Sequence, residues 1–173
     1  MKKITFFAAI AMIAFTTNVV AQSTAEDFAV TNATVITPIT ITKNVDMNFG
    51  NLVATAAGGA IVLTTSGTRT GPPAILLGTQ NGTVTAAKFT VKGETGFTYG
   101  ITLPSTFNVS DAVVSPDTGT MAVGTFVSSP DATGTLTDGT ETLLVGATIT
   151  LGVDQASGVY TNDTDLAVTV MYN

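Results

Sequence analysis

The sequence predicts an all-β protein, an antiparallel immunoglobulin-like two-sheet sandwich that follows a cleaved signal peptide. Apolar residues alternate with small or polar ones along many short segments, the signature of half-buried strands. Clusters of Gly, Pro, Asn, Asp and Ser separate these segments at intervals of about ten residues, as turns do. After the leader we see no apolar stripe with the 3.6-residue period of a helix. Strands with one buried and one exposed face favour a sandwich.

The first 21 residues have the pattern of a secretory signal peptide. Met1, Lys2 and Lys3 form a short basic region, and residues 4–15 form an apolar one. Because the small residue Ala21 ends the leader, we expect cleavage after it. The apolar run is shorter than the ~20 residues of a membrane helix, and the chain has no Cys for a lipid anchor. We therefore expect an exported, soluble bacterial protein with no membrane span in its mature part.

The charge of the mature chain excludes several partners. Loss of Lys2 and Lys3 leaves four basic residues against twelve acidic ones, a net charge of about −8. Nucleic acids and anionic membranes attract basic patches. The sequence therefore predicts neither as a partner.

Seven segments carry strand patterns, and one domain of residues 33–173 contains them all. Most alternate in parity, whereas residues 60–64 form a continuous apolar run, typical of a strand buried on both faces. The residues between them, such as Asp131–Gly134, are predicted turns. The predicted strands cover residues 39–49, 60–64, 89–92, 97–103, 120–127, 145–153 and 166–173.

Residues 22–32 form an N-terminal arm ahead of this domain. Phe28 and Val30 give it a short alternation. One interpretation makes residues 28–37 the first strand of the chain's own sandwich. The other makes the arm an extended donor strand that fills a groove in a neighbouring subunit.

Several segments together resemble the bacterial family known as domain of unknown function 4402. They keep their order along nearly the whole mature chain. They are TPITITK (37–43) with DMNFG (46–50), TVTAAKFTVKG (83–93), GFTYGITLP (96–104), VGATITLG (145–152), and GVY (158–160) with VTVMYN (168–173).

That family is in turn similar to spore-coat-U-like and archaic chaperone–usher pilin domains. The resemblance implies a sandwich that lacks one strand, which the N-terminal extension of a neighbour supplies. The C-terminal strand then borders the open groove. The residues expected at the groove are Leu166, Val168, Val170 and Tyr172, and the donor candidates are Phe28 and Val30. A periplasmic chaperone and other pilin-like subunits are the partners that the resemblance implies.

The sequence shows no catalytic or metal-binding signature. The chain has no His and no Cys, so it has no His-based triad, thiol nucleophile or His/Cys zinc cluster. Asn162, Asp163 and Asp165 resemble a calcium loop only superficially and are interpreted as a solvated turn. We expect a non-enzymatic chain with no catalytic, cofactor or metal site.

The sequence thus predicts a structural subunit of a cell-surface or fimbrial assembly, a homo-oligomer built by β-strand complementation and placed at the cell surface, in a fimbrium or in the periplasm. The alternative is a self-contained surface or periplasmic sandwich that binds a glycan or a protein through its loops.

Overall fold

The computed structural model describes residues 24–76, 78–111, 113 and 119–173. The predicted signal peptide and its cleavage site after Ala21 lie outside these residues. The chain divides after Thr34 into an N-terminal segment and a compact unit, Val35–Asn173. Residues 24–34 contain no strand and have exposed side chains.

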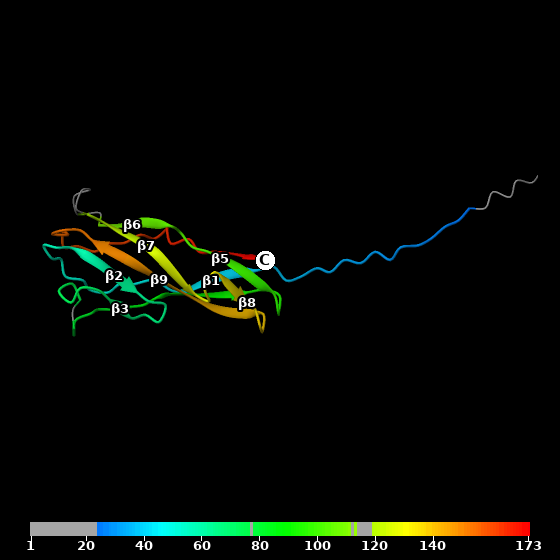
Figure 1. Cartoon of the computed structure of the whole chain (residues 1–173), viewed down its shortest axis with the longest axis horizontal. Coiled ribbons are helices and arrows are strands. Elements are labelled where there is room, and N and C mark those ends of the chain that lie inside the picture. The colour runs from blue at the N-terminus through cyan, green and yellow to red at the C-terminus, as the bar shows by residue number, and fades with distance from the viewer. Residues whose placement is uncertain (1–23, 77, 112, 114–118) are drawn as a thin grey trace, which may run out of the picture. The chain divides into compact units, whose positions relative to one another are not determined.

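The compact unit contains only antiparallel strand pairs in two sheets, and no helix occurs in the described residues (Figure 1). The predicted all-β fold with antiparallel strands in two sheets is confirmed. The strands are β1 (Thr40–Val45), β2 (Gly59–Leu63), β3 (Arg69–Thr70), β4 (Ala87–Lys92), β5 (Thr98–Thr102), β6 (Thr106–Ser110), β7 (Thr120–Ser129), β8 (Thr133–Thr135), β9 (Thr140–Leu151) and β10 (Thr169–Tyr172).

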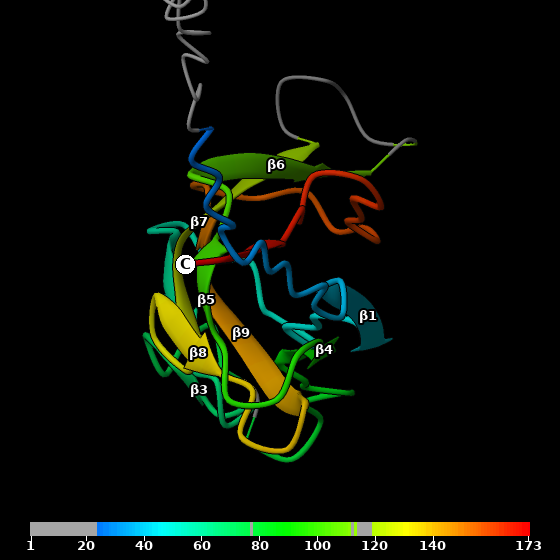
Figure 2. The ribbon, with the colours of Figure 1, turned by 90° about the vertical axis from the view of Figure 1, so that its right-hand side faces the viewer.

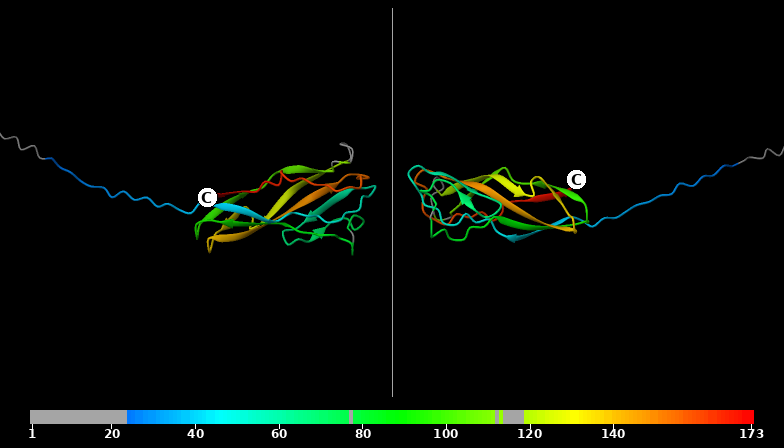
Figure 3. Two further views of the ribbon diagram at one scale, coloured as in Figure 1. Left: turned by 180° about the vertical axis from the view of Figure 1, so that it is seen from behind. Right: turned by 60° about the horizontal axis from the view of Figure 1, so that its bottom comes forward.

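The long strand β9 organises the larger sheet, and it runs diagonally through the unit in Figure 2. One edge of β9 pairs first with β4 and then with β2, while the other edge pairs with β7. β1 lies outside β4, β3 outside β2, and β6 outside β7. The smaller sheet has the order β10-β5-β8, so β10 is an edge strand (Figure 3).

Two apolar clusters form the core, and β9 contributes to both. Leu143 and Val145 on the first half of β9 belong to a cluster with Tyr99 of β5 and Leu136, all 0% exposed. Ile149 and Leu151, on the second half, join a cluster with residues of β2 and β7. We call these the closed half and the open half, for the reason given below.

Two details differ from the sequence prediction. Residues 60–64 are not buried on both faces, because Ile61 is fully buried whereas Val62 is 41% exposed. The strand lies in a sheet that is covered on one side only. The predicted turn Asp131–Gly134 instead runs into β8. Gly134 fits there because a Cβ at this position would collide with the Tyr99 ring.

The structure also bears on the two interpretations of the arm. No strand forms over residues 28–37, and the first strand begins at Thr40. This disagrees with the interpretation that residues 28–37 are the first strand of the chain's own sandwich.

Candidate functional site: an apolar groove in the open half

A cavity of about 1090 Å³ opens mainly onto the second apolar cluster and also reaches Ala87 and Phe89 of the first. Its floor is apolar and comes from four strands, β4, β6, β7 and β9, and from the connection between β1 and β2. The floor residues include Phe49, Ala87, Phe89, Phe107, Val109, Met121, Val123, Ile149 and Leu151. Two stretches of chain form its walls, residues 43–54 on one side and residues 155–166 on the other.

The floor consists of core side chains that no strand covers. Met121 and Leu151 are 8% and 5% exposed, whereas Leu143 and Val145 in the closed half are 0% exposed. Side chains that line a void lack packing partners on one side and lose dispersion energy there. The groove is therefore an incomplete part of the core, and an apolar occupant would complete it.

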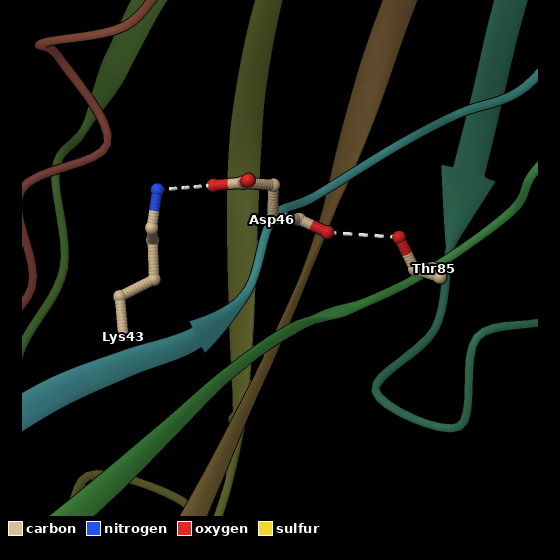
Figure 4. A network of polar contacts seen from close by, with 3 residues as sticks. All are labelled: Lys43, Asp46 and Thr85. Atoms are coloured by element: carbon tan, nitrogen blue, oxygen red, sulfur yellow. Dashed lines mark hydrogen bonds and ion pairs between the residues drawn. The ribbon is translucent and has the colours of Figure 1, made fainter.

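Polar contacts fix the first wall where it leaves β1. Lys43 forms an ion pair with Asp46, and the Thr85 hydroxyl donates to the Asp46 carbonyl at 2.8 Å (Figure 4). A β-bulge between Lys43 and Val45 bends the chain at this point. Asn48 and Thr85 then exchange backbone hydrogen bonds of 2.8 and 3.0 Å. These bonds attach the wall to the segment that directly precedes β4.

Arg69 holds the next part of this wall. Its guanidinium donates to the Phe49 carbonyl, to the Asn51 carbonyl at 2.9 Å, and to Asn81 Oδ1 at 2.9 Å. Gly50 lies between the two carbonyls with φ of +68°, and its missing Cβ leaves room for the carbonyl of Asn81. The left-handed backbone and the close approach both require glycine here.

Hydrogen bonds within the second wall give it a fixed shape. Gln155 is 8% exposed; its Oε1 accepts from the Gly152 N–H at 3.0 Å, and its Nε2 donates to the Tyr160 hydroxyl at 3.0 Å. The Tyr160 hydroxyl donates to the Ala156 carbonyl at 2.7 Å. Thr161 pairs with Ser110 at the end of β6. The wall thus continues the larger sheet beyond β6.

The structure separates the residues that were expected at the groove. Leu166 lines the cavity. Val168, Val170 and Tyr172 are half-buried and, like Leu166, pack against the closed half, but they do not line the cavity. Between them on β10, Met171 faces outward and is 72% exposed. The donor candidates Phe28 and Val30 are 87% and 85% exposed.

The outer edge of β10 has no strand partner among the described residues. β10 pairs only with β5. The Ile101 N–H donates to Ala132 on the opposite side of β5, so the backbone of Val170, which faces Ile101 across the pair, points away from β5. β1 likewise pairs only with β4. These two edges therefore have no strand partner in the described residues, and the β1 edge borders the cavity through Lys43 and Val45.

Sequence reasoning missed most of the floor and Arg69. Phe107 and Val109 alternate with polar residues in β6, a signal that was present, but the segment is short and follows Pro104 directly. Arg69 had no local signal, because its partners are 12 to 20 residues away along the chain.

The segment that superficially resembles a calcium loop makes its hydrogen bonds within the protein. Asn162 Oδ1 accepts from the N–H groups of Thr164 and Asp165, and its amide donates to the Asn108 carbonyl and to Asp165. This segment is a turn tied by its own side chains. In the part of the chain that the structure describes, no group of acidic side chains is arranged to hold a metal ion. Within those same residues, no helix has the length and apolarity to cross a membrane.

These features define a β-sandwich domain with an incomplete, groove-bearing core. The profile of the family described as a domain of unknown function, DUF4402, matches residues 39–172. The chain belongs to this family. No curated protein and no solved structure gives a significant match.

Proposed function

We propose that this protein is an exported structural subunit of a cell-surface or fimbrial assembly, in which the groove of one subunit accepts an extended strand from another. The observation that carries the proposal is the cavity itself. An apolar floor lies open between two walls, and the unpaired edge of β1 borders it through Lys43 and Val45. Exposed core and unpaired backbone groups are both unfavourable, and one inserted strand removes both.

The occupant is residues 24–36 of a second copy. Within this stretch Phe28, Val30 and Val35 are 85 to 97% exposed, and residues 24–36 contain no strand of their own. Strand addition gains affinity from backbone hydrogen bonds and specificity from alternate side chains in pockets. Phe28 and Val30 lie on the same face of an extended chain and are the side chains that we expect to enter the groove.

The position of the groove favours a polymer over a closed dimer. The compact unit begins, and the chain ends, at one end of the sandwich, while the wall formed by residues 155–163 lies toward the other end (Figures 1 and 3). A donor segment and an acceptor groove are different surfaces of the chain, so their contact is head-to-tail. Such contacts produce filaments when the rotation between subunits does not close a ring. A periplasmic chaperone that keeps the groove covered before assembly fits this scheme.

A groove-blocking substitution tests the proposal. Val109 lines the cavity, so Val109→Phe fills part of it; Val127 lies outside it and is 46% exposed, so Val127→Phe is the matched control. The mature chain and both variants are compared by light scattering and by unheated denaturing gels. We expect multiples that collapse to one band on boiling for the wild type and Val127→Phe, and monomers for Val109→Phe.

A wild-type chain that stays monomeric at every concentration would contradict the proposal. That result would direct attention to the loops and to a glycan or protein ligand, the alternative function of a self-contained sandwich.

A further inference from the structure

Three residues from distant parts of the compact unit form a hydrogen-bonded latch. The Tyr172 hydroxyl on β10 donates to the Thr37 carbonyl at 2.8 Å and accepts from the Glu94 N–H at 2.6 Å. The Thr37 N–H donates to the Glu94 carboxylate at 2.8 Å. We call Thr37, Glu94 and Tyr172 the latch. It joins the segment before β1, the turn after β4 and the C-terminal strand.

The surroundings of the latch fix the Tyr172 ring. Phe97 packs against it edge-to-face, with ring centroids 5.6 Å apart and an interplanar angle of 66°. Gly93 lies beside the hydroxyl, and a Cβ at this position would collide with it. The remaining face of the ring packs on the closed half. A side chain held by packing and by two hydrogen bonds keeps one position.

The latch lies where the gap between β1 and β10 is too narrow for a strand. Cα atoms of the two strands come within 8 Å of each other. Two strands that hold a third between them are about 9.5 Å apart, twice the ordinary strand spacing. The cavity agrees with this limit. Its lining includes Lys43 and Val45 at the end of β1 and Leu166 before β10, but no residue of β10 and no latch residue.

An open apolar groove does not specify register by itself. A strand that slips by two residues presents the same face and makes equivalent backbone hydrogen bonds, so only a feature at a fixed position distinguishes the registers. In residues 24–36 such a slip exchanges Val30 for Phe28 or for Asn32 at a given place on the floor. A barrier at one end of the groove removes this freedom.

We propose that the latch is an end-stop that sets the register of the strand accepted by the groove. This inference rests on the proposed function and adds a specificity-determining residue, Tyr172, to it. Tyr172 acts as a positioning residue, because it does not line the cavity but ties β10 to the segment before β1 and so holds the gap between β1 and β10 closed.

Disulfide mapping between copies tests the end-stop. The chain has no Cys, so introduced thiols report without background. Ser157→Cys places an exposed thiol on the second wall of an acceptor copy. A donor copy carries one Cys at each position of residues 26–34 in turn. The two chains are mixed, assembled and oxidised with a copper–phenanthroline catalyst and oxygen, and the yield of cross-linked dimer is measured for each position.

With Tyr172 in the acceptor, we expect one donor position to exceed those two residues away by about tenfold, a difference of about 1.4 kcal/mol. In the Tyr172→Phe acceptor, the yields at those positions should become comparable. Glu94→Ala, which removes the carboxylate from Thr37 and leaves Tyr172 in place, should spread the register in the same direction and keeps the test valid if Tyr172→Phe does not fold. Met171→Ala, on the exposed face of the same strand, should leave the register unchanged.

An unchanged single register in folded Tyr172→Phe and Glu94→Ala acceptors would overturn the end-stop while leaving strand complementation intact. The absence of a cross-link at every position in the wild-type acceptor would overturn the proposed function, and the end-stop with it.

Discussion

The two halves of the sandwich share one strand and differ in what covers it. β9 passes through both, with Leu143 and Val145 in the closed half and Ile149 and Leu151 in the open half. The three-stranded sheet β10-β5-β8 covers the closed half, where Tyr99 and Leu136 are completely buried. In the open half a cavity occupies the corresponding place. The same alternating pattern therefore has a complete core at one end and an incomplete one at the other.

The difference shows that the apolar pattern of β9 extends beyond the part of the core that one copy completes, as the proposed strand complementation requires. Apolar residues at floor positions gain little while the cavity stays empty, and they gain packing contacts when a strand fills it. In the proposed assembly, the closed half would provide the stability of the free subunit, and the open half would provide the free energy of association.

Replacing one leucine of β9 in each half by alanine should give the largest change in the free energy of unfolding. The two losses should differ between the closed half and the open half. Leu143→Ala removes a side chain packed on all sides and should cost about 3–5 kcal/mol of unfolding free energy. Leu151→Ala should cost less, about 2 kcal/mol, because one side of this side chain already faces the cavity. Chemical denaturation of the two monomeric variants measures both values. Equal losses would contradict the distinction between the halves.

The alkaline limit of stability should depend on the closed half. Burial, followed by the hydrogen bond and the negative charge of Glu141, raises the pKa of Tyr99 far above its usual range. A group whose folded-state pKa is raised contributes stability below its unfolded pKa of about 10 and loses it as pH rises further. We expect the melting temperature to fall above pH 10. The same fall in Tyr99→Phe would show that another group is responsible.

Loss of the latch hydroxyl should have a moderate effect. Tyr172→Phe keeps the ring and removes two hydrogen bonds, which should cost about 1 kcal/mol because the freed Thr37 carbonyl and Glu94 N–H remain accessible to water. Denaturant midpoints of the monomer measure this loss, with Met171→Ala as the control on the same strand. A variant as stable as the wild type would indicate that the latch bonds add nothing to the free subunit.

The smallest expected effect is an acid dependence at the same place. The N–H of Thr37 lowers the pKa of the Glu94 carboxyl. A lowered folded-state pKa contributes stability above the unfolded value of about 4.3, and this contribution is lost as pH falls through the folded pKa. Comparing melting temperatures at pH 5 and pH 3 should show a slightly larger fall for the wild type than for Glu94→Gln. Equal falls would exclude Glu94 as the source.

The sequence predicted the fold class better than the site. Strong alternation located residues 97–103, which contain β5, and residues 120–127, which form most of β7. β3 and β8 have two and three residues, and such short strands depend on pairing with distant partners rather than on a local pattern. β9 begins five residues earlier than predicted, at Thr140, because its first part pairs with β4.

The groove could not be predicted from periodicity, because a missing neighbour leaves no pattern in the strands that remain. Phe107 and Met121 look like any core residues in the sequence, and only the packing shows that a cavity faces them. Leu166 was predicted at the groove because of the family resemblance. The latch could not be predicted from local patterns, because Thr37 and Tyr172 are 135 residues apart in the sequence.

The most direct test of strand complementation uses the chain without residues 22–34 and a synthetic peptide of residues 24–36. We expect the peptide to bind and to raise the unfolding free energy of the domain, by about 2.7 kcal/mol at a concentration one hundred times its Kd. A peptide with Phe28 and Val30 both replaced by Ser should bind much more weakly. Thermal unfolding at increasing peptide concentration measures both. An unchanged melting temperature at millimolar wild-type peptide would contradict the claim that the open half accepts this strand.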